Sequence, residues 1–369
     1  MACTDVGAST VERALIGRAK EKKVPINGSL ELLPLCNMNC DMCYVRLDRK
    51  EVERAGGLRT ADEWLEIGRQ MKESGVLFLL LTGGEPLLFP NFKRLYRELR
   101  GMGFILTINT NGTLIGEEWA AFFGKYPPRR VNITLYGADN EDYERLCHYP
   151  GGFEKTVRGI RLLREKGVEV KLSFSITKAN LQSMKSVFAV GEELQVPVHV
   201  APYMMPAVRE RSCPFSEQAR VLPEEAAAAS LEALKLQFPR EIYDQYVEQA
   251  IARVEDPAFP RGDGHLSCLA GNCSFTINWQ GMMRPCVVMS EPSSPVFEKS
   301  FTAAWEEITA SAQRLTLPEK CIACRYKPVC KVCVAAAFLE TGVYDKIPDY
   351  LCRYSEEYYR LLTEEQNHG

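Results

Sequence analysis

The stretch CNMNCDMC (residues 36–43) is the most informative part of the chain, and it directly follows SLELLPL (29–35), a predicted strand. Its three cysteines, Cys36, Cys40 and Cys43, can bind a metal group through their thiolates. Iron–sulfur cubanes usually take four cysteines, so three would leave one iron open to an outside ligand. The alternative is a zinc site that combines three cysteines with a histidine or water, although all four histidines are distant in sequence.

A second motif, Thr82-Gly83-Gly84-Glu85-Pro86, closes the next predicted strand, VLFLLLT (76–82). Glycines let a backbone approach a ligand closely, and Glu85 can accept hydrogen bonds from an ammonium group. A GGE turn alone is common. Its position after the second strand, when the first strand ends at three cysteines, favours a ligand site.

The first half of the chain alternates between strand and helix patterns. Six strands joined by helices indicate an α/β fold with a parallel sheet, right-handed crossovers and functional loops at the carboxyl ends of the strands. The continuous apolar run at 76–82 is typical of a strand buried on both faces. The predicted strands are 29–35, 76–82, 104–110, 131–137, 168–177 and 196–202, and the predicted helices are 61–74, 91–103, 115–125, 152–167 and 181–194.

Composition limits the classes of function. The chain has 369 residues, a net charge of −3 and 14 cysteines, and this charge gives no electrostatic reason to expect nucleic-acid binding. The N-terminal region has no signal-peptide pattern, and the longest apolar run, Val332–Leu339, is too short to cross a membrane. We therefore expect a cytoplasmic protein without a membrane partner, whose reduced cysteines bind metal.

Eight cysteines gather in the last third of the chain. This is the number that two clusters with four cysteine ligands each would need. A four-thiolate zinc site formed by 321–333 is the alternative, and it would leave four thiols without a role. The eight are Cys268, Cys273, Cys286, Cys321, Cys324, Cys330, Cys333 and Cys352.

The region between the two cysteine groups predicts a change of architecture. Residues 203–222 break the strand–helix pattern, a helical pair covers about 223–255, and 257–264 indicate a linker. A hairpin is predicted in SFTINWQGMMRP (274–285), with helices at 301–312 and about 353–364. We expect an N-terminal extension (1–28), a barrel (29–202), a helical connection (203–264) and a small cysteine-rich α+β domain (265–369).

CNMNCDMC and GGEP resemble the cluster-binding and methionine-amino motifs of radical S-adenosylmethionine (SAM) enzymes. The resemblance covers about residues 29–202 and implies a partial (β/α)6 barrel. It also implies that Cys36, Cys40 and Cys43 bind a 4Fe-4S cluster whose fourth iron is chelated by SAM. Reductive cleavage of SAM would give a 5′-deoxyadenosyl radical that abstracts hydrogen from a substrate, with an electron donor such as flavodoxin or ferredoxin.

The same resemblance implies the SAM contacts. Thr82, Gly83, Gly84 and Glu85 form the methionine-amino motif, and Met42 stands where family members pack the adenine. The other implied contacts follow later strands, where a turn or cap role is the alternative, and they are Asn109, Thr110, Asn111, Thr134 and Arg145.

The C-terminal cysteines, with Gly281-Met-Met-Arg-Pro-Cys286, resemble the SPASM domain attached to some radical SAM enzymes. This likeness implies two auxiliary 4Fe-4S clusters with interleaved ligands. The first would use Cys268, Cys273, Cys286 and Cys333, and the second Cys321, Cys324, Cys330 and Cys352.

SPASM enzymes mostly modify peptides or proteins, which leaves several reactions open. An oxidative crosslink (carbon–carbon or thioether) in a ribosomally made precursor peptide fits complete auxiliary clusters. Formylglycine formation by a sulfatase maturase is disfavoured, because Val287 replaces the Asp that follows the PC element in those enzymes. A peptide epimerase would need a thiol hydrogen donor, for which Cys147 and Cys213 are available.

Two further expectations concern partners and a non-catalytic alternative. Residues 1–28 are too short for a leader-recognition domain, so a separate protein, or the barrel mouth itself, is expected to recognise the precursor peptide. A zinc-stapled binding module without catalysis would require the GGEP match to be accidental.

Overall fold

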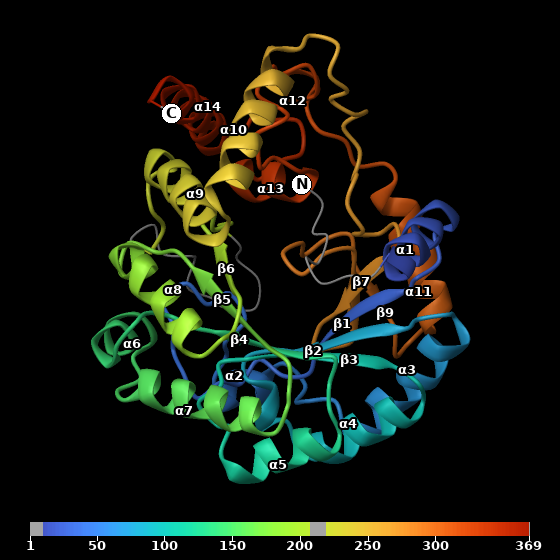
Figure 1. The fold of residues 1–369 in the computed structure, drawn as a ribbon. Coiled ribbons are helices and arrows are strands. Elements are labelled where there is room, and N and C mark those ends of the chain that lie inside the picture. Colours follow the sequence, from blue (N-terminus) through green and yellow to red (C-terminus); the bar gives the residue numbers. More distant parts are fainter. Residues whose placement is uncertain (1–9, 207–218, 369) are drawn as a thin grey trace.

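The computed structural model describes residues 10–206 and 219–368, and its centre is one nine-stranded sheet (Figure 1). The strand order is β6-β5-β4-β3-β2-β1-β7-β8-β9, with parallel pairing from β6 through β7 and antiparallel pairing for β8 and β9. The predicted α/β fold with an open, mostly parallel barrel is therefore confirmed. The first six strands are β1 (Asn27–Glu31), β2 (Phe78–Thr82), β3 (Ile105–Thr110), β4 (Arg130–Thr134), β5 (Val170–Ser175) and β6 (Val198–Ala201).

Burial along β2 alternates between its two faces. Leu79 and Leu81 are buried, whereas Phe78, Leu80 and Thr82 are only half-buried. The expectation that this run is buried on both faces is therefore wrong, because only one face is fully buried.

Helices cover the outer face of the sheet (Figure 1). Thr60 caps the first of them through a reciprocal capping box with Glu63, as its sequence predicts. The helices between the strands agree with the predicted positions to within a few residues. They are α3 (Ala61–Glu73), α4 (Phe92–Gly101), α5 (Glu117–Lys125), α7 (Gly152–Glu165) and α8 (Met184–Glu193).

Five of the described α-helices were not predicted from the sequence. Three of them, α1 (Thr10–Lys22), α2 (Arg49–Arg54) and α6 (Asn140–Cys147), are rich in polar and charged residues that give little periodicity. The other two are the short α12 (Glu319–Ile322) and α13 (Val334–Thr341), which lies in the apolar run 332–339.

The C-terminal hairpin joins the barrel sheet. The predicted hairpin forms from β7 (Ser274–Ile277) and β8 (Met282–Arg284), and β9 (Ser294–Pro295) pairs with β8. The sequence did not indicate that β7 would pair in parallel with β1. Gly28 permits this contact, because a Cβ there would lie 2.3 Å from the ring of Phe275.

Helices α9 (Pro223–Gln237), α10 (Arg240–Glu255) and α14 (Asp349–His368) pack together, whereas α11 (Phe301–Ala312) lies beside α3 and β9 (Figure 1). A buried hydrogen bond between Ser230 and Tyr354 joins α9 to the C-terminal helix α14. Among the described helices, none is long and apolar enough to span a bilayer.

Candidate functional site

The three N-terminal cysteines lie in the loop between β1 and α2. Backbone N–H groups point at two of their sulfurs: Met38 N lies 3.4 Å from Cys36 Sγ, and Arg46 N lies 3.3 Å from Cys43 Sγ. Cys40 is buried and its carbonyl accepts the N–H of Cys43. N–H groups directed at sulfur stabilise thiolates, so this loop suits thiolate ligands.

The two glycines of the GGEP motif let their backbone pack on the segment that leads into the cysteine loop. Gly84 N donates to Leu33 O at 2.7 Å, and Glu85 N donates to Leu35 O at 2.9 Å. A Cβ on Gly83 would lie 2.4 Å from Leu33 O, and one on Gly84 would lie 2.3 Å from Leu35 O. The motif therefore fixes the position of the loop that begins at Cys36.

Glu85 is completely buried and surrounded by hydrogen-bond donors. Its carboxylate accepts from Thr110 Oγ1 at 2.8 Å, from Asn111 N at 2.9 Å and from Leu87 N at 3.1 Å. Burial raises the pKa of Glu85 to about 7, although these hydrogen bonds oppose the shift. The carboxylate thus ties the end of β3 to the GGEP turn.

The end of β3 also reaches the cysteine loop. Asn111 Nδ2 donates to Asn37 Oδ1 at 2.9 Å and lies 3.7 Å from Cys36 Sγ. Asn37 in turn donates to Thr113 Oγ1 at 2.8 Å. The structure therefore brings Asn111 and Thr110 together with Glu85 and Cys36, as expected for residues that share one site.

The other SAM contacts implied by the sequence are placed less directly. Asn109 accepts a hydrogen bond from Asn132 at 2.8 Å, Thr134 ends β4 half-buried, and Met42 packs against the main core. Arg145 is exposed on α6, where its guanidinium bonds Asp142 at 2.5 Å and Ala179 O at 2.8 Å. These two hydrogen bonds of Arg145 are therefore to residues of α6 and of the segment that follows β5.

Cys147 is a neighbour of the three-cysteine motif that sequence spacing could not reveal. It ends α6 fully buried, and its side chain is hydrogen-bonded to that of Cys40. Tyr136, which follows β4, also hydrogen-bonds Cys40 through its side chain. Cys213, the other proposed hydrogen donor, lies outside the described residues.

Four C-terminal cysteines line one small cavity of about 50 Å³: Cys321, Cys324, Cys330 and Cys352. These are the members of the second auxiliary set in the sequence analysis. Val332 N lies 3.4 Å from Cys330 Sγ, and Ser355 also hydrogen-bonds this sulfur. The half-buried Lys327 lines the same cavity, where desolvation lowers its pKa and the surrounding thiols oppose that shift.

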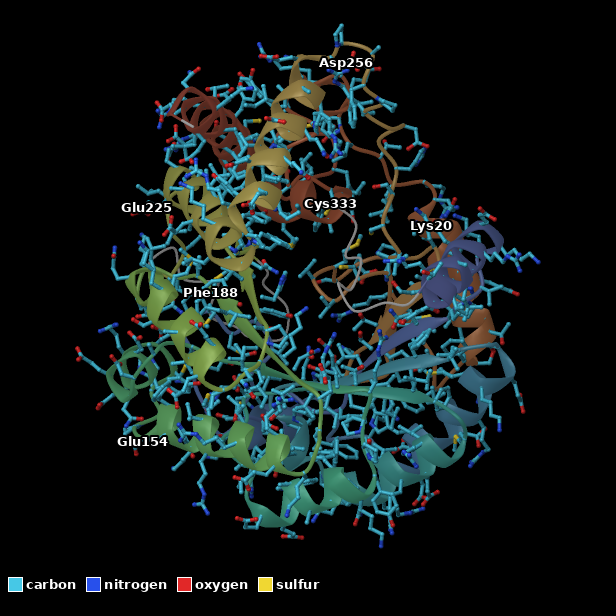
Figure 2. The ribbon with its side chains drawn as sticks, in the orientation of Figure 1. Lys20, Glu154, Phe188, Glu225, Asp256 and Cys333 are labelled. Atoms are coloured by element: carbon cyan, nitrogen blue, oxygen red, sulfur yellow. The ribbon has the colours of Figure 1, made fainter. Side chains whose placement is uncertain are left out.

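The other four cysteines interact with one another in a separate group. The charge of Cys268 helps to raise the pKa of Cys273, Cys286 and Cys333, and the charge of Cys333 helps to raise the pKa of Cys286. Cys333, labelled in Figure 2, caps the N-terminus of α13, where its Sγ accepts from Ala336 N at 3.4 Å. Burial raises the pKa of Cys273 and Cys286 to about 11, so both are protonated thiols at neutral pH unless a metal group binds them.

The donor chemistry of the three groups fits iron–sulfur clusters, because cysteine thiolates are their usual ligands. Within residues 10–206 and 219–368, no three His, Cys, Asp or Glu side chains converge closely enough to hold a single metal ion.

Comparisons with known proteins cover both halves of the chain. Residues 30–181 match the Radical SAM superfamily. The chain is 26% identical over 326 residues to the AdoMet-dependent heme synthase of Methanosarcina barkeri, covering 85% of this chain and 92% of the relative. It is 26% identical over 170 residues to the PqqA peptide cyclase of Granulibacter bethesdensis, covering 46% and 45%. The solved structure of Streptococcus suis SuiB bound to precursor peptide SuiA matches with a TM-score of 0.66 at 16% identity, covering 95% of this chain and 84% of SuiB.

Proposed function

We propose that this chain is an enzyme that uses SAM and a 4Fe-4S cluster to modify a ribosomally made peptide, because residues 30–181 match the Radical SAM superfamily. The proposed reaction is an oxidative carbon–carbon or thioether crosslink. The observation that supports the oxidative part is that four of the eight C-terminal cysteines, Cys321, Cys324, Cys330 and Cys352, line one cavity.

In this proposal Cys36, Cys40 and Cys43 hold the SAM-binding cluster, which with SAM supplies a 5′-deoxyadenosyl radical when bound. The chain positions these groups. Gly83 and Gly84 bring the GGEP backbone against the cysteine loop, and Glu85 holds the end of β3 beside it. Thr82, Asn109, Thr110, Asn111, Thr134, Met42 and Arg145 stay proposed SAM contacts.

We further propose two auxiliary 4Fe-4S clusters in a SPASM domain spanning 265–369, after the barrel at 29–202 and the helical connection at 203–264. The first set is Cys268, Cys273, Cys286 and Cys333, and the second is Cys321, Cys324, Cys330 and Cys352. Complete thiolate ligation suits a cluster that accepts an electron from a substrate radical, which is what an oxidative crosslink requires.

A peptide substrate is supported by two relatives, the PqqA peptide cyclase and SuiB bound to its precursor peptide. Val287 after Cys286 argues against formylglycine formation. Epimerisation would need a hydrogen-donating thiol, Cys147 or Cys213. A flavodoxin or ferredoxin as electron donor and a separate leader-recognition protein complete the proposed set of partners.

A second candidate function is the synthesis of a heme-type product. It is favoured by one observation, the match to the AdoMet-dependent heme synthase that extends over 92% of that relative, whereas the peptide cyclase matches only about half of each chain. No motif in the sequence indicated a porphyrin substrate, because the C-terminal motifs are cysteines that indicate cluster ligands and not a substrate.

The test is a product assay with the anaerobically reconstituted enzyme, SAM and a reductant. Mass spectrometry of a candidate precursor peptide should show a loss of two hydrogens. A product whose mass is unchanged in H2O, but which takes up deuterium when the reaction is run in D2O, would indicate epimerisation instead. A formylglycine mass would indicate the sulfatase-type reaction. Conversion of an iron porphyrin precursor to heme, with every candidate peptide unchanged, would overturn the peptide proposal in favour of the second candidate.

A further inference from the structure

Cys40 differs from the other two cysteines of its motif in its surroundings. Its sulfur accepts hydrogen bonds from two side chains distant in sequence, the thiol of Cys147 and the hydroxyl of Tyr136. The sulfurs of Cys36 and Cys43 are approached by nearby backbone N–H groups, and Cys36 Sγ also has one distant side-chain donor, Asn111 Nδ2 at 3.7 Å. Two donors therefore converge on one predicted cluster ligand.

The C-terminal end of α6 places Cys147 in this position. Asn39 N donates to Cys147 O at 3.0 Å, and Asp41 N donates to Leu146 O at 3.1 Å. The last carbonyls of the helix therefore accept hydrogen bonds from the residues on both sides of Cys40. A third contact joins His148 Nε2 to Asp41 Oδ1 at 2.7 Å. The side chain of Cys147 is held against Cys40 from within the core, where its exposed fraction is 0%.

Tyr136 is held by contacts with two other elements. Asn180 Nδ2 donates to Tyr136 O at 2.8 Å, and the ring of Tyr143 packs edge-on at 5.6 Å from the Tyr136 ring. The hydroxyl thus reaches Cys40 from the segment that follows β4. Because Cys147 and Tyr136 come from different elements, each can be removed without removing the other.

We propose that Tyr136 and Cys147 are positioning residues that raise the reduction potential of the cluster bound at Cys40. This inference rests on the proposed cluster site and not on the identity of the substrate. Reduction adds negative charge to the cluster and its sulfurs, and hydrogen bonds to those sulfurs stabilise the added charge. The negative end of the α6 dipole, which points at this loop, acts in the opposite sense, so the two donors offset it.

The experiment is an EPR-monitored redox titration of the reconstituted protein without peptide. In Tyr136→Phe and Cys147→Ala the ratio of reduced to oxidised cluster at a fixed potential should fall about tenfold, which equals 59 mV for one electron. Cys147→Ser retains a donor and should stay close to the wild type. Tyr96→Phe is the matched control, because it removes a buried hydroxyl that donates to the backbone carbonyl of Tyr126 at 2.8 Å.

Iron content, measured on the same samples, separates the two proposals. An unchanged midpoint potential in both Tyr136→Phe and Cys147→Ala at full iron content overturns the inference. Should Cys147→Ala fail to retain iron, Tyr136→Phe carries the test alone, since it removes only one hydroxyl. A wild type that binds no iron at Cys36, Cys40 and Cys43 would instead overturn the proposed function itself. A failed peptide assay would not affect the test, because the reduction potentials are measured without peptide.

Discussion

At the scale of single residues, Glu85 shows how a motif residue can have more than one task. The sequence assigned it an ammonium ligand, whereas the structure also gives its carboxylate three donors from Thr110, Asn111 and Leu87. A residue in this position organises the site before any ligand arrives.

The raised pKa of Glu85 predicts a pH-dependent stability. Its folded pKa of about 7 lies above the ordinary 4.5, so the folded chain binds the extra proton and is stabilised at low pH relative to high pH. The stability of the metal-free protein should fall by up to about 3 kcal/mol as pH rises from 4.5 to 7. Glu85→Gln should lack this component. Urea unfolding at pH 5, 6, 7 and 8 measures it, and parallel pH curves for both proteins would refute it.

Gly84 offers a second test at the residue scale. In Gly84→Ala the new methyl group would collide with Leu35 O and Pro34 O, so the cysteine loop must move, with a loss of about 1–3 kcal/mol and of iron bound there. Gly101→Ala, where no atom lies within 4 Å, is the control and should be neutral or slightly stabilising. Chemical denaturation and iron analysis check both variants, and full iron binding in Gly84→Ala would contradict the assigned role.

At the scale of elements, sequence patterns located strands β1–β6 and their helices because each has a clear period and turn residues at its ends. The α6 helix was not predicted, because NEDYERLC is short and mostly polar. In the structure its buried Tyr143, Leu146 and Cys147 anchor it. The pairing of β7 with β1 was not predicted for another reason. Local sequence specifies a strand, but it does not specify which distant strand becomes its neighbour.

Phe275 tests the junction of β7 and β1. Its ring lies under Gly28 and packs edge-on against Phe301 at 5.0 Å. Phe275→Ala should lower the free energy of unfolding by about 3–5 kcal/mol, because it opens a cavity where the hairpin meets the barrel. Val11→Ala is the control, since Val11 is 78% exposed. Urea titration followed by circular dichroism measures the change, and a loss below about 1 kcal/mol would show that the junction contributes little.

At the scale of the whole molecule, the three groups of cysteines stay a prediction, which the resemblance supplied and which spacing alone left open. Cys330 and Cys333 are three residues apart, yet the first lines the cavity with Cys352 whereas the second interacts with Cys268 and Cys286. Position in the chain cannot distinguish the partners of such close neighbours. Nor could it reveal Cys147 beside Cys40.

Counting iron tests the interleaved sets. The reconstituted wild type should hold about twelve irons per chain, and Cys330→Ala and Cys333→Ala should each lose about four. Because the two residues are proposed to serve different clusters, the double variant should lose about eight. Iron and sulfide analysis under anaerobic conditions gives the counts. A double variant that loses no more iron than each single one would place both cysteines at the same cluster.

The parallel pairing of β1 with β7 has a consequence for how the chain folds during synthesis. Strand β1 is made early, but the strand that covers its free edge is completed only at Ile277. At ribosomal rates of about 5–20 residues per second, this edge stays uncovered for ten seconds or more. An uncovered strand edge is a template for pairing with other chains. Slow translation between Ala201 and Ile277 should therefore increase aggregation of the nascent protein, even though the first six strands are already complete.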